Sequence, residues 1–185
     1  MIISIGGTPG AGKSTISKML AKKLDWPRYY IGGLRRQKAR ERGMTIAEYN
    51  KLGETDPSTD LEVDKYQEEL GKKEDDFIIE GRTSWYFIPH SLKLYFDVDE
   101  QEGARRIFKE LQDENSRNEG KKPQDTKEVL ENIRQRTISD KKRYRKYFGI
   151  DPYEKKNYDH VIDTTYLNQE EVFKKTYDIV KKYLN

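Results

Sequence analysis

The sequence predicts an α/β fold in which helices cover a parallel sheet of five strands. Short apolar runs alternate with longer polar segments of helical periodicity, which is the pattern that successive βα units give. The runs interpreted as buried strands are residues 2–6, 29–31, 77–80, 92–98 and 160–163. The segments interpreted as helices are residues 13–24, 34–73, 100–112, 125–148 and 168–184, with breaks expected near Gly43 and Pro57.

Each predicted element has a local reason in the chain. The first helix places its apolar residues at helical spacing on one face, namely Ile16, Met19, Leu20 and Leu24. Pro27 prevents that helix from continuing, because proline has no amide hydrogen and clashes with the preceding turn. We expect Gly32-Gly33 to turn the chain after the second strand, Gly81 to end the third strand, and residues 113–124 to form a polar loop.

Two long segments, residues 34–73 and 107–143, carry so much charge that we expect them to lie outside the core. The sheet and its covering helices would then come from residues 1–31, 77–106 and 145–185. The sequence therefore predicts a single domain over residues 1–185, with two polar excursions from the sheet.

Composition excludes several classes of protein. Charged residues make up 37% of the 185 residues, and 36 basic against 33 acidic residues leave a net charge of +3. The chain has no cysteine and two histidines, so disulfides, thiolate metal sites and histidine-rich metal centres are not expected. No apolar run is long enough to span a bilayer, and the first residues lack a basic leader. We expect a cytoplasmic protein that does not bind membranes.

A phosphate-binding loop follows the first strand. Residues 7–14 read Gly-Thr-Pro-Gly-Ala-Gly-Lys-Ser and fit the pattern G-x-x-x-x-G-K-[ST]. Gly7 and Gly12 allow a tight turn whose N–H groups, with the next helix N-terminus, bind phosphate. Lys13 can reach the outer phosphates, and the Ser14 hydroxyl can bind Mg²⁺. We therefore expect ATP and Mg²⁺ as cofactors, held by Gly7, Thr8, Pro9, Gly10, Ala11, Gly12, Lys13, Ser14 and Thr15.

Arginines near the expected strand ends favour a small kinase over the other classes of protein that contain a phosphate-binding loop. The chain is short for a motor or a helicase, and it lacks the Asn-Lys-x-Asp element with which small GTPases bind guanine. Small kinases need cationic groups to neutralise two phosphates that would otherwise repel each other. Candidates are Arg35, Arg36, Arg82, Arg105 and Arg106, together with Arg136, Asp140 and Arg143, which share one helix face.

The combination of motifs resembles the nucleoside monophosphate kinases, and in particular the short archaeal-type cytidylate kinases. The resemblance rests on the opening residues 2–15, on residues 32–44, on Glu80-Gly81-Arg82 and on the R-x-x-x-D-x-x-R pattern of residues 136–143. It implies a three-layer α/β/α P-loop kinase fold with a monophosphate-binding insertion at residues 32–76 and a lid at residues 107–144. The core would be residues 1–31, 77–106 and 145–185.

The resemblance also implies roles for individual residues. The acceptor would be bound by Arg36, Asp60, Asp64, Glu80, Gly81 and Arg82, and the catalytic set would be Lys13, Arg82, Arg136, Asp140 and Arg143. Asp140 would orient Arg136 or the sugar, and Glu80 would hold a water bound to Mg²⁺. Residues 163–165 would pack near the donor adenine. The implied reaction is phosphorylation of CMP or dCMP by ATP.

Two departures leave the acceptor base open. Bacterial cytidylate kinases have Asp-Ser-Gly where this chain reads Tyr30-Ile31-Gly32, and an aspartate where it has Thr83. Alternatives are therefore a P-loop kinase for another nucleoside monophosphate or for a small alcohol.

A nucleic-acid-binding ATPase is a third possibility, because residues 35–42 and 141–146 are basic clusters. Interleaved acids disfavour it, so we expect a monomer that binds no nucleic acid. The aromatic group at residues 85–87 can serve packing or base stacking, and neither histidine is expected to be catalytic.

Overall fold

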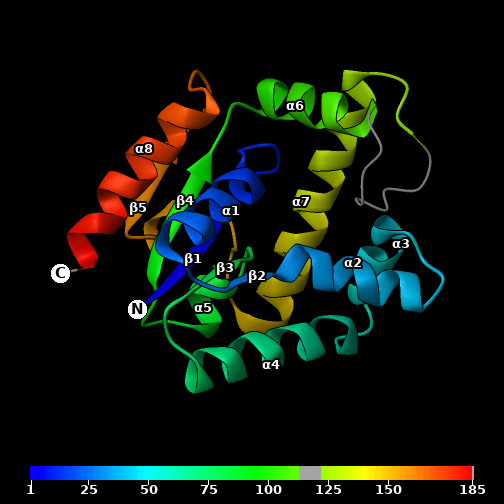
Figure 1. Cartoon of the computed structure of the whole chain (residues 1–185). Coiled ribbons are helices and arrows are strands. Elements are labelled where there is room, and N and C mark those ends of the chain that lie inside the picture. The colour runs from blue at the N-terminus through cyan, green and yellow to red at the C-terminus, as the bar shows by residue number, and fades with distance from the viewer. Residues whose placement is uncertain (113–121, 185) are drawn as a thin grey trace.

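The computed structural model describes residues 1–112 and 122–184 and contains one parallel sheet. Figure 1 shows its strands, which lie in the order β2-β3-β1-β4-β5. Their bounds are β1 (Ile2–Gly7), β2 (Arg28–Tyr30), β3 (Phe77–Glu80), β4 (Leu92–Asp97) and β5 (His160–Asp163). All four ladders are parallel, so the predicted five-stranded parallel sheet is confirmed.

Helices cover both faces of the sheet and make three layers. On one face, α1 (Lys13–Leu24) and α8 (Gln169–Val180) pack on β1, β4 and β5 through a core that includes Ile16, Leu20, Val172 and Val180. On the other face, a second core joins Val63 and Leu70 of α4 (Ser58–Lys73) to β3. The short helix α5 (Ser84–Phe87), which the sequence did not predict, lies on that face too.

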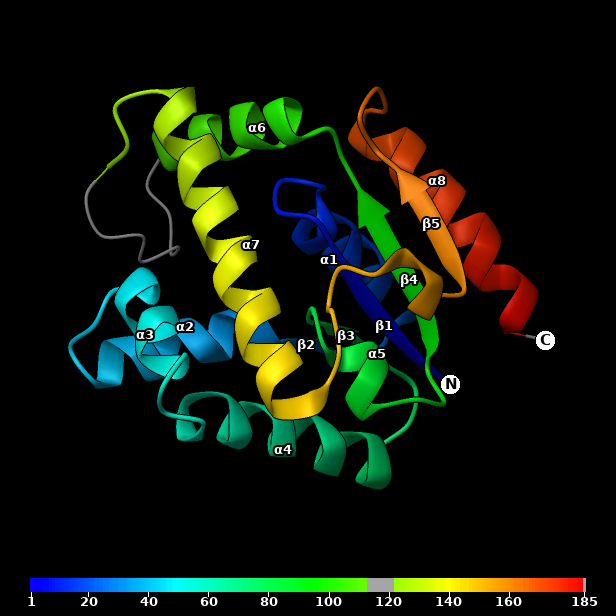
Figure 2. The same ribbon diagram turned by 180° about the vertical axis from the view of Figure 1, so that it is seen from behind.

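The remaining helices extend away from the sheet on two excursions. Between β2 and β3 the chain forms α2 (Ile31–Glu41), α3 (Ile46–Gly53) and α4. Between β4 and β5 it forms α6 (Glu100–Gln112), the long helix α7 (Thr126–Phe148) and the 3₁₀ turn η1 (Lys155–Asn157). Figure 2 shows α7 running from α6 to the region of α2, α3 and α4. A 3₁₀ turn, η2 (Lys181–Tyr183), follows α8.

Local capping explains where several of these helices begin and end. Thr45 and Asn168 form capping boxes with Glu48 and Glu171 at the starts of α3 and α8, which satisfies backbone N–H groups at each end. Asp125 caps α7, and Gly149 ends it in the left-handed conformation with φ +71°. Within the residues that the structure describes, no helix is both long and apolar enough to cross a membrane.

One expected turn is wrong. Gly32 and Gly33 do not turn the chain; they lie in the first turn of α2, which already begins at Ile31. They are glycines because the ring of Tyr30 lies against them: a Cβ built on Gly33 would lie 2.6 Å from that ring and one on Gly32 would lie 2.9 Å from it. The two glycines therefore make room for an aromatic side chain. Most of the loop expected over residues 113–124 lies outside the described residues.

The prediction that the two polar segments stay out of the interior is also wrong. Asp60 of α4 and Asp140 and Arg143 of α7 are each 1% exposed or less. Charged side chains are rarely buried unless they are paired. Their burial shows that α2, α4 and α7 meet around a polar interior, which is the starting point for the site.

Candidate active site

The loop between β1 and α1 has the backbone geometry of a phosphate cradle. Gly7, Gly10 and Gly12 adopt positive φ angles of 129°, 81° and 80°, which L side chains rarely adopt. Gly7 also approaches β4 so closely that a Cβ there would lie 2.0 Å from the Phe96 carbonyl oxygen. A Cβ on Gly12 would meet nothing within 4 Å, so this glycine faces open space.

Thr8 fixes the loop to the neighbouring strand. Its N–H donates to the Phe96 carbonyl at 3.0 Å, and its hydroxyl oxygen accepts from the Val98 N–H at 3.1 Å. The loop is thereby held from its outer side, and the other residues from Gly7 to Thr15 line a cleft. Thr8 is the one member of the predicted nucleotide loop that faces β4 instead.

The start of α1 fits an anionic ligand. No side chain caps this helix, and its first turn contains no acidic residue, unlike the first turns of α3, α7 and α8. Uncapped N–H groups and the helix dipole together favour negative charge at this position. The Lys13 ammonium donates to the carbonyl oxygens of Gly7 and Thr8, at 3.0 Å for Gly7, and so lies along the loop.

Oxygen atoms that could hold a cation lie beside the loop. The Ser14 hydroxyl and the buried Glu80 carboxylate both contact the guanidinium of Arg28, which donates to them at 2.9 and 2.6 Å. Ser17 donates to the same Glu80 oxygen at 3.1 Å. The residues described contain no group of three or more His, Cys, Asp or Glu able to hold a metal. One carboxylate and one hydroxyl are a donor set that Mg²⁺ can use, because it commonly binds one or two carboxylates together with substrate phosphates.

One cleft of about 1310 Å³ brings most of the predicted site residues together. The phosphate loop lies on one side, with Glu80, Gly81 and Arg82 at the end of β3. The cleft is also lined by arginines from three helices, namely Arg35, Arg36 and Arg40 of α2, Arg105 and Arg106 of α6, and Arg136 and Arg143 of α7. Asp60, Asp64 and Asp140 do not line it.

The two neighbouring arginines of α2 have different partners. Arg36 is 4% exposed and donates to the Tyr30 hydroxyl at 2.8 Å and to the Gly32 carbonyl at 3.1 Å. Arg35 is similarly buried and donates to Asn50 at 2.9 Å, to the Thr59 carbonyl at 3.0 Å and to Asp60. Both were candidates from the sequence, but a specific role was expected only for Arg36.

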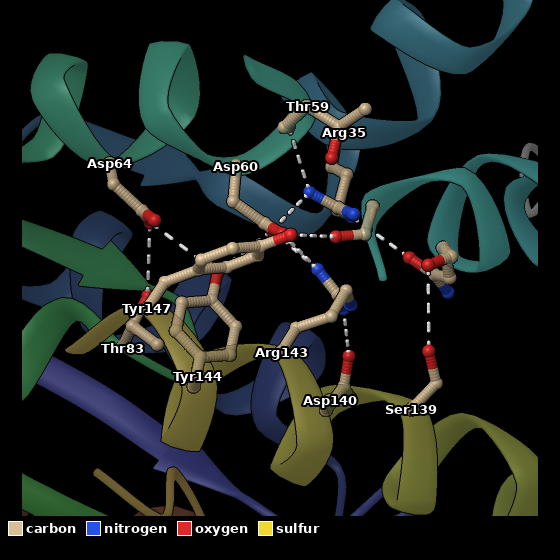
Figure 3. Close-up of polar contacts among 12 residues, drawn as sticks. Arg35, Thr59, Asp60, Asp64, Thr83, Ser139, Asp140, Arg143, Tyr144 and Tyr147 are labelled. Carbon is tan, nitrogen blue, oxygen red and sulfur yellow. Dashed lines mark hydrogen bonds and ion pairs between the residues drawn. The ribbon is translucent and has the colours of Figure 1, made fainter. Parts of the chain in front are cut away.

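Behind the cleft wall, acidic and basic groups alternate in a buried network (Figure 3). Asp60 accepts from Arg35 and from Arg143, and Arg143 also donates to one oxygen of Asp140. The other oxygen of Asp140 accepts from Arg82 and, at 2.7 Å, from the Tyr153 hydroxyl. The network therefore joins α2, α4 and α7 to the residues that follow β3.

Asp140 was expected to orient Arg136 or the sugar. It accepts hydrogen bonds from Arg82, Arg143 and Tyr153. Burial acts to raise the pKa of Asp140, yet the charges of Arg82 and Arg143 outweigh it and hold that pKa below its ordinary value. The charge of Arg136 also acts to lower that pKa. Asp140 is thus an ionised anchor for two cleft arginines.

Asp64, unlike Asp140, has a raised pKa. Burial, followed by the neighbouring charge of Asp60, raises the pKa of Asp64 to about 8. Its Oδ1 atom accepts from Gln67 at 3.1 Å and from the hydroxyls of Thr83 and Tyr144 at 3.4 Å. Its Oδ2 atom is buried without a hydrogen-bond partner. A protonated carboxyl is favoured at this position at neutral pH.

On the far side of the phosphate loop, Arg106 joins α6 to the loop after β5. It donates to the carbonyls of Thr164 and Thr165 at 2.8 and 3.1 Å, and to Glu102 at 2.7 Å. Hydrogen bonds from Arg105 and Arg106 lower the pKa of Glu102 to about 2. These contacts hold Thr164 and Thr165, which line the cleft. Residues 163–165 are the segment expected to pack near the donor adenine.

Several participants were missed by sequence reasoning. Arg28, Tyr144 and Tyr153 each contact predicted site residues, but no motif marks them. Arg28 is brought in by the pairing of β2 with β3, Tyr144 by the packing of α7 against α4, and Tyr153 by the segment that follows α7. The aromatic group at residues 85–87 serves packing: Trp85 donates to the Arg82 carbonyl at 3.1 Å, and Tyr86 and Phe87 pack on Phe148.

Comparison with known proteins agrees with this geometry. A model of the cytidylate kinase-like family matches residues 2–166. The chain belongs to that family. A cytidylate kinase of Methanothermobacter thermautotrophicus is 35% identical over 174 residues, which cover 92% of this chain and 99% of that protein. A cytidylate kinase of Methanopyrus kandleri is 32% identical over 184 residues, covering 94% of this chain and 89% of that protein.

Solved structures agree on the fold. A shikimate kinase from Bacteroides thetaiotaomicron superposes with a TM-score of 0.64 at 16% identity, covering 100% of this chain and 98% of the other. Such a likeness shows the architecture alone, and it confirms the predicted three-layer P-loop kinase fold. The family assignment rests on the sequence relatives.

Proposed function

We propose that this protein transfers a phosphoryl group from ATP to a nucleoside monophosphate, with CMP and dCMP as the preferred acceptors. The observation that carries the proposal is one cleft in which a phosphate loop lies opposite Arg36, Arg82, Arg136 and Arg143. Two phosphate groups that must approach each other need this density of fixed positive charge. The curated relatives named cytidylate kinases support the choice of acceptor.

On the donor side, the loop from Gly7 to Thr15 and the start of α1 would hold the ATP phosphates. Lys13 would exchange its carbonyl partners for the outer phosphates. Ser14 directly, and Glu80 through water, would hold Mg²⁺, which neutralises charge on the phosphates when it is bound. Arg106 and residues 163–165 would border the adenine.

On the acceptor side, Arg36 and Arg82 would bind the monophosphate. An oxygen of that phosphate attacks the γ-phosphorus, a new P–O bond forms, and the bond to the β-phosphate oxygen breaks to release ADP. Arg136 and Arg143 would stabilise the charge that develops during transfer. Gly81 keeps the chain close to Gln67 and Ser84, because a Cβ there would lie 2.4 Å from the Ser84 hydroxyl.

Asp60, Asp64 and Asp140 would act on the acceptor side from behind the wall. In the described structure each contacts residues of the cleft and not the cleft itself, and Asp140 and Asp60 together hold Arg143. The role of Asp60 and Asp140 in this proposal is to fix the direction of the arginines before substrate arrives, which preorganises the charge. Asp64 would act through Thr83 and Tyr144, which it contacts.

Residues 32–76 and 107–144 would be the monophosphate-binding insertion and the lid of a single domain that works as a monomer. Closing segments of this kind exclude water, which would otherwise accept the γ-phosphate. The monomer is supported by the cleft lining, which one chain supplies from both polar segments and from the sheet.

The nucleic-acid alternative is disfavoured by burial. Arg35 and Arg36, which begin the first basic cluster, are 7% and 4% exposed, and Arg143 and Tyr144 of the second cluster are 1% and 5% exposed. Neither cluster therefore offers its full set of side chains to a nucleic acid.

The test is formation of ADP from ATP with CMP, dCMP, UMP, AMP or GMP as the acceptor. We expect turnover with CMP and dCMP and little with the purine nucleotides. Lys13→Ala should lower kcat about 100-fold or more, because it removes a preorganised charge. Lys22→Ala, an exposed lysine of the same helix, is the matched control. Equal loss in both variants, or turnover by none of the acceptors, would contradict the proposal.

A further inference from the structure

Arg28 lies where the functional proposal places the divalent cation. It opens β2, pairs with Ile78 of β3, and extends its side chain toward α1. Its Nη2 atom donates to the Ser14 hydroxyl at 2.9 Å and to Glu80 Oε2 at 2.6 Å, so one nitrogen joins both groups. No sequence motif drew attention to it.

The guanidinium is held in this position from several directions. Its Nε atom donates to the Ser17 hydroxyl at 2.7 Å, and Ser17 in turn donates to the same Glu80 oxygen at 3.1 Å. Its carbon atom lies 5.1 Å from the centre of the Tyr30 ring. Ser17 is fully buried and Glu80 is 5% exposed, so Arg28 supplies the positive charge that a buried carboxylate requires.

Arg28 and a divalent cation compete for the same oxygen atoms. A Ser14 hydroxyl that accepts from Arg28 has less electron density for Mg²⁺, and the Glu80 oxygen already has two donors. Two cations close together also repel each other strongly where solvent is scarce. Binding of Mg²⁺ to Ser14, with one of its waters on Glu80, therefore requires that Arg28 release at least one of these two residues.

We propose that Arg28 is a positioning residue that holds Ser14 and Glu80 in the nucleotide-free cleft and yields them to the divalent cation. The inference rests on the proposed function, since it takes ATP and Mg²⁺ as the ligands. As a consequence, Mg²⁺ raises the affinity for the nucleotide less in the wild-type chain than it would if Arg28 were absent. Without Mg²⁺ the same charge stays beside the phosphates and favours metal-free ATP.

The experiment measures binding and not turnover. A fluorescent, non-hydrolysable ATP analogue is titrated with and without Mg²⁺, and the coupling ratio is the Kd without Mg²⁺ divided by the Kd with it. In Arg28→Met we expect this ratio to rise on the order of tenfold over the wild-type chain, the size typical of changes beside metal ligands. Adding Glu80→Gln to Arg28→Met should cancel the rise, because the freed carboxylate is its source.

Arg134→Met is the matched control. Arg134 also pairs with a glutamate, Glu100, but both are about half exposed on α6 and α7, and neither enters the cation site. Its coupling ratio should equal that of the wild-type chain. If Arg28→Met does not fold, Arg28→Lys replaces it, because one ammonium without the guanidinium fork holds Ser14 and Glu80 less firmly. We expect a smaller rise in that variant.

An unchanged or lower coupling ratio in Arg28→Met, or in Arg28→Lys where that variant is the one that folds, overturns the inference. The proposed function fails separately, if the wild-type chain does not bind the analogue at all or does not phosphorylate any nucleoside monophosphate.

Discussion

Arg82 and Asp140 form an ion pair that fastens the end of β3 to the buried side of α7. The two residues are 58 positions apart, and Asp140 is completely buried. The pair joins the sheet, which carries the phosphate loop, to the helix that carries Arg136 and Arg143. The direction of the cleft arginines thus depends on a carboxylate that does not line the cleft.

Removing the charge of Asp140 should therefore weaken both stability and catalysis. We expect Asp140→Asn to lower the free energy of unfolding by about 3 kcal/mol, the cost of breaking one side of a buried ion pair. It should also lower kcat/KM about 100-fold, because Arg82 and Arg143 lose their alignment. Urea denaturation and steady-state kinetics measure the two effects.

Asp178→Asn is the control for that variant. Asp178 also pairs with a basic residue, Lys181, but on the exposed surface of the protein, where solvent screens the two charges and an ion pair contributes little to stability. If Asp140→Asn is no less stable than Asp178→Asn, the buried network does not hold the cleft arginines in place.

Alanine substitutions at Gly12 and Gly149 distinguish an effect of backbone strain on stability from an effect on ligand binding. Gly12 and Gly149 have similar φ angles of 80° and 71°, and a Cβ on either would meet nothing within 4 Å. Alanine at either position should cost about 1 to 2 kcal/mol of stability. Only Gly12→Ala should also weaken ATP binding, by about tenfold or more for a lost charge-assisted hydrogen bond. Calorimetric titration of both variants checks this; equal ATP affinities would show that Gly12 does not face the phosphates.

Arg36 should act on the acceptor and not on the donor. We expect Arg36→Met to raise the KM for CMP about 10- to 100-fold, the loss of a hydrogen bond to a charged group, with the KM for ATP nearly unchanged. Arg42→Met is its control, since Arg42 lies in the same segment, is exposed and does not line the cleft. A rise in the KM for ATP as large as that for CMP would place Arg36 on the donor side.

Asp64 should make the free energy of unfolding decrease as the pH rises, whereas a carboxylate in an ion pair has the opposite effect. A pKa of about 8 in the folded chain is above the ordinary value of 3.8, so the folded state binds a proton that the unfolded state has lost. Stability from this group is fully present below about pH 4 and decreases as the pH rises toward 8. Between pH 6 and 8 the wild-type chain should lose up to about 1.4 kcal/mol per pH unit relative to Asp64→Asn.

Urea denaturation of both chains at pH 6, 7 and 8 measures that difference. Asparagine keeps the shape of a protonated aspartate and does not titrate, so the comparison isolates one group. A difference between the two chains that stays constant over this range would mean that Asp64 is already ionised at pH 6.

The fold could be predicted largely from sequence because its determinants are local. Runs such as residues 77–80 and 92–98 are short, apolar and flanked by polar or turn residues, which favours buried strands, and the glycines of residues 7–12 favour a tight loop. The turn expected at Gly32-Gly33 was wrong because a glycine pair is compatible both with a turn and with close packing against a neighbouring ring. In the structure the two glycines lie in the first turn of α2 against the ring of Tyr30, a side-chain position that the sequence pattern does not give.

The residues that line the cleft could be predicted from sequence, but many of the residues that hold them in position could not. Lys13, Arg36, Arg82 and Arg143 belong to motifs, and the structure places them around one cleft. Arg28 and Tyr153 belong to none, and their contacts depend on which strands pair and where α7 ends. The burial of Asp60 and Asp140 was missed because charge density in a segment says nothing about pairing across segments.

The most direct test of phosphoryl transfer follows the transferred group itself. The wild-type chain is incubated with ATP labelled with ³²P at the γ-phosphate, together with CMP and Mg²⁺, and the products are separated. We expect the label in CDP, with an equal amount of ADP formed. Label that stays in ATP, or that appears only as inorganic phosphate, would contradict phosphoryl transfer to a nucleoside monophosphate.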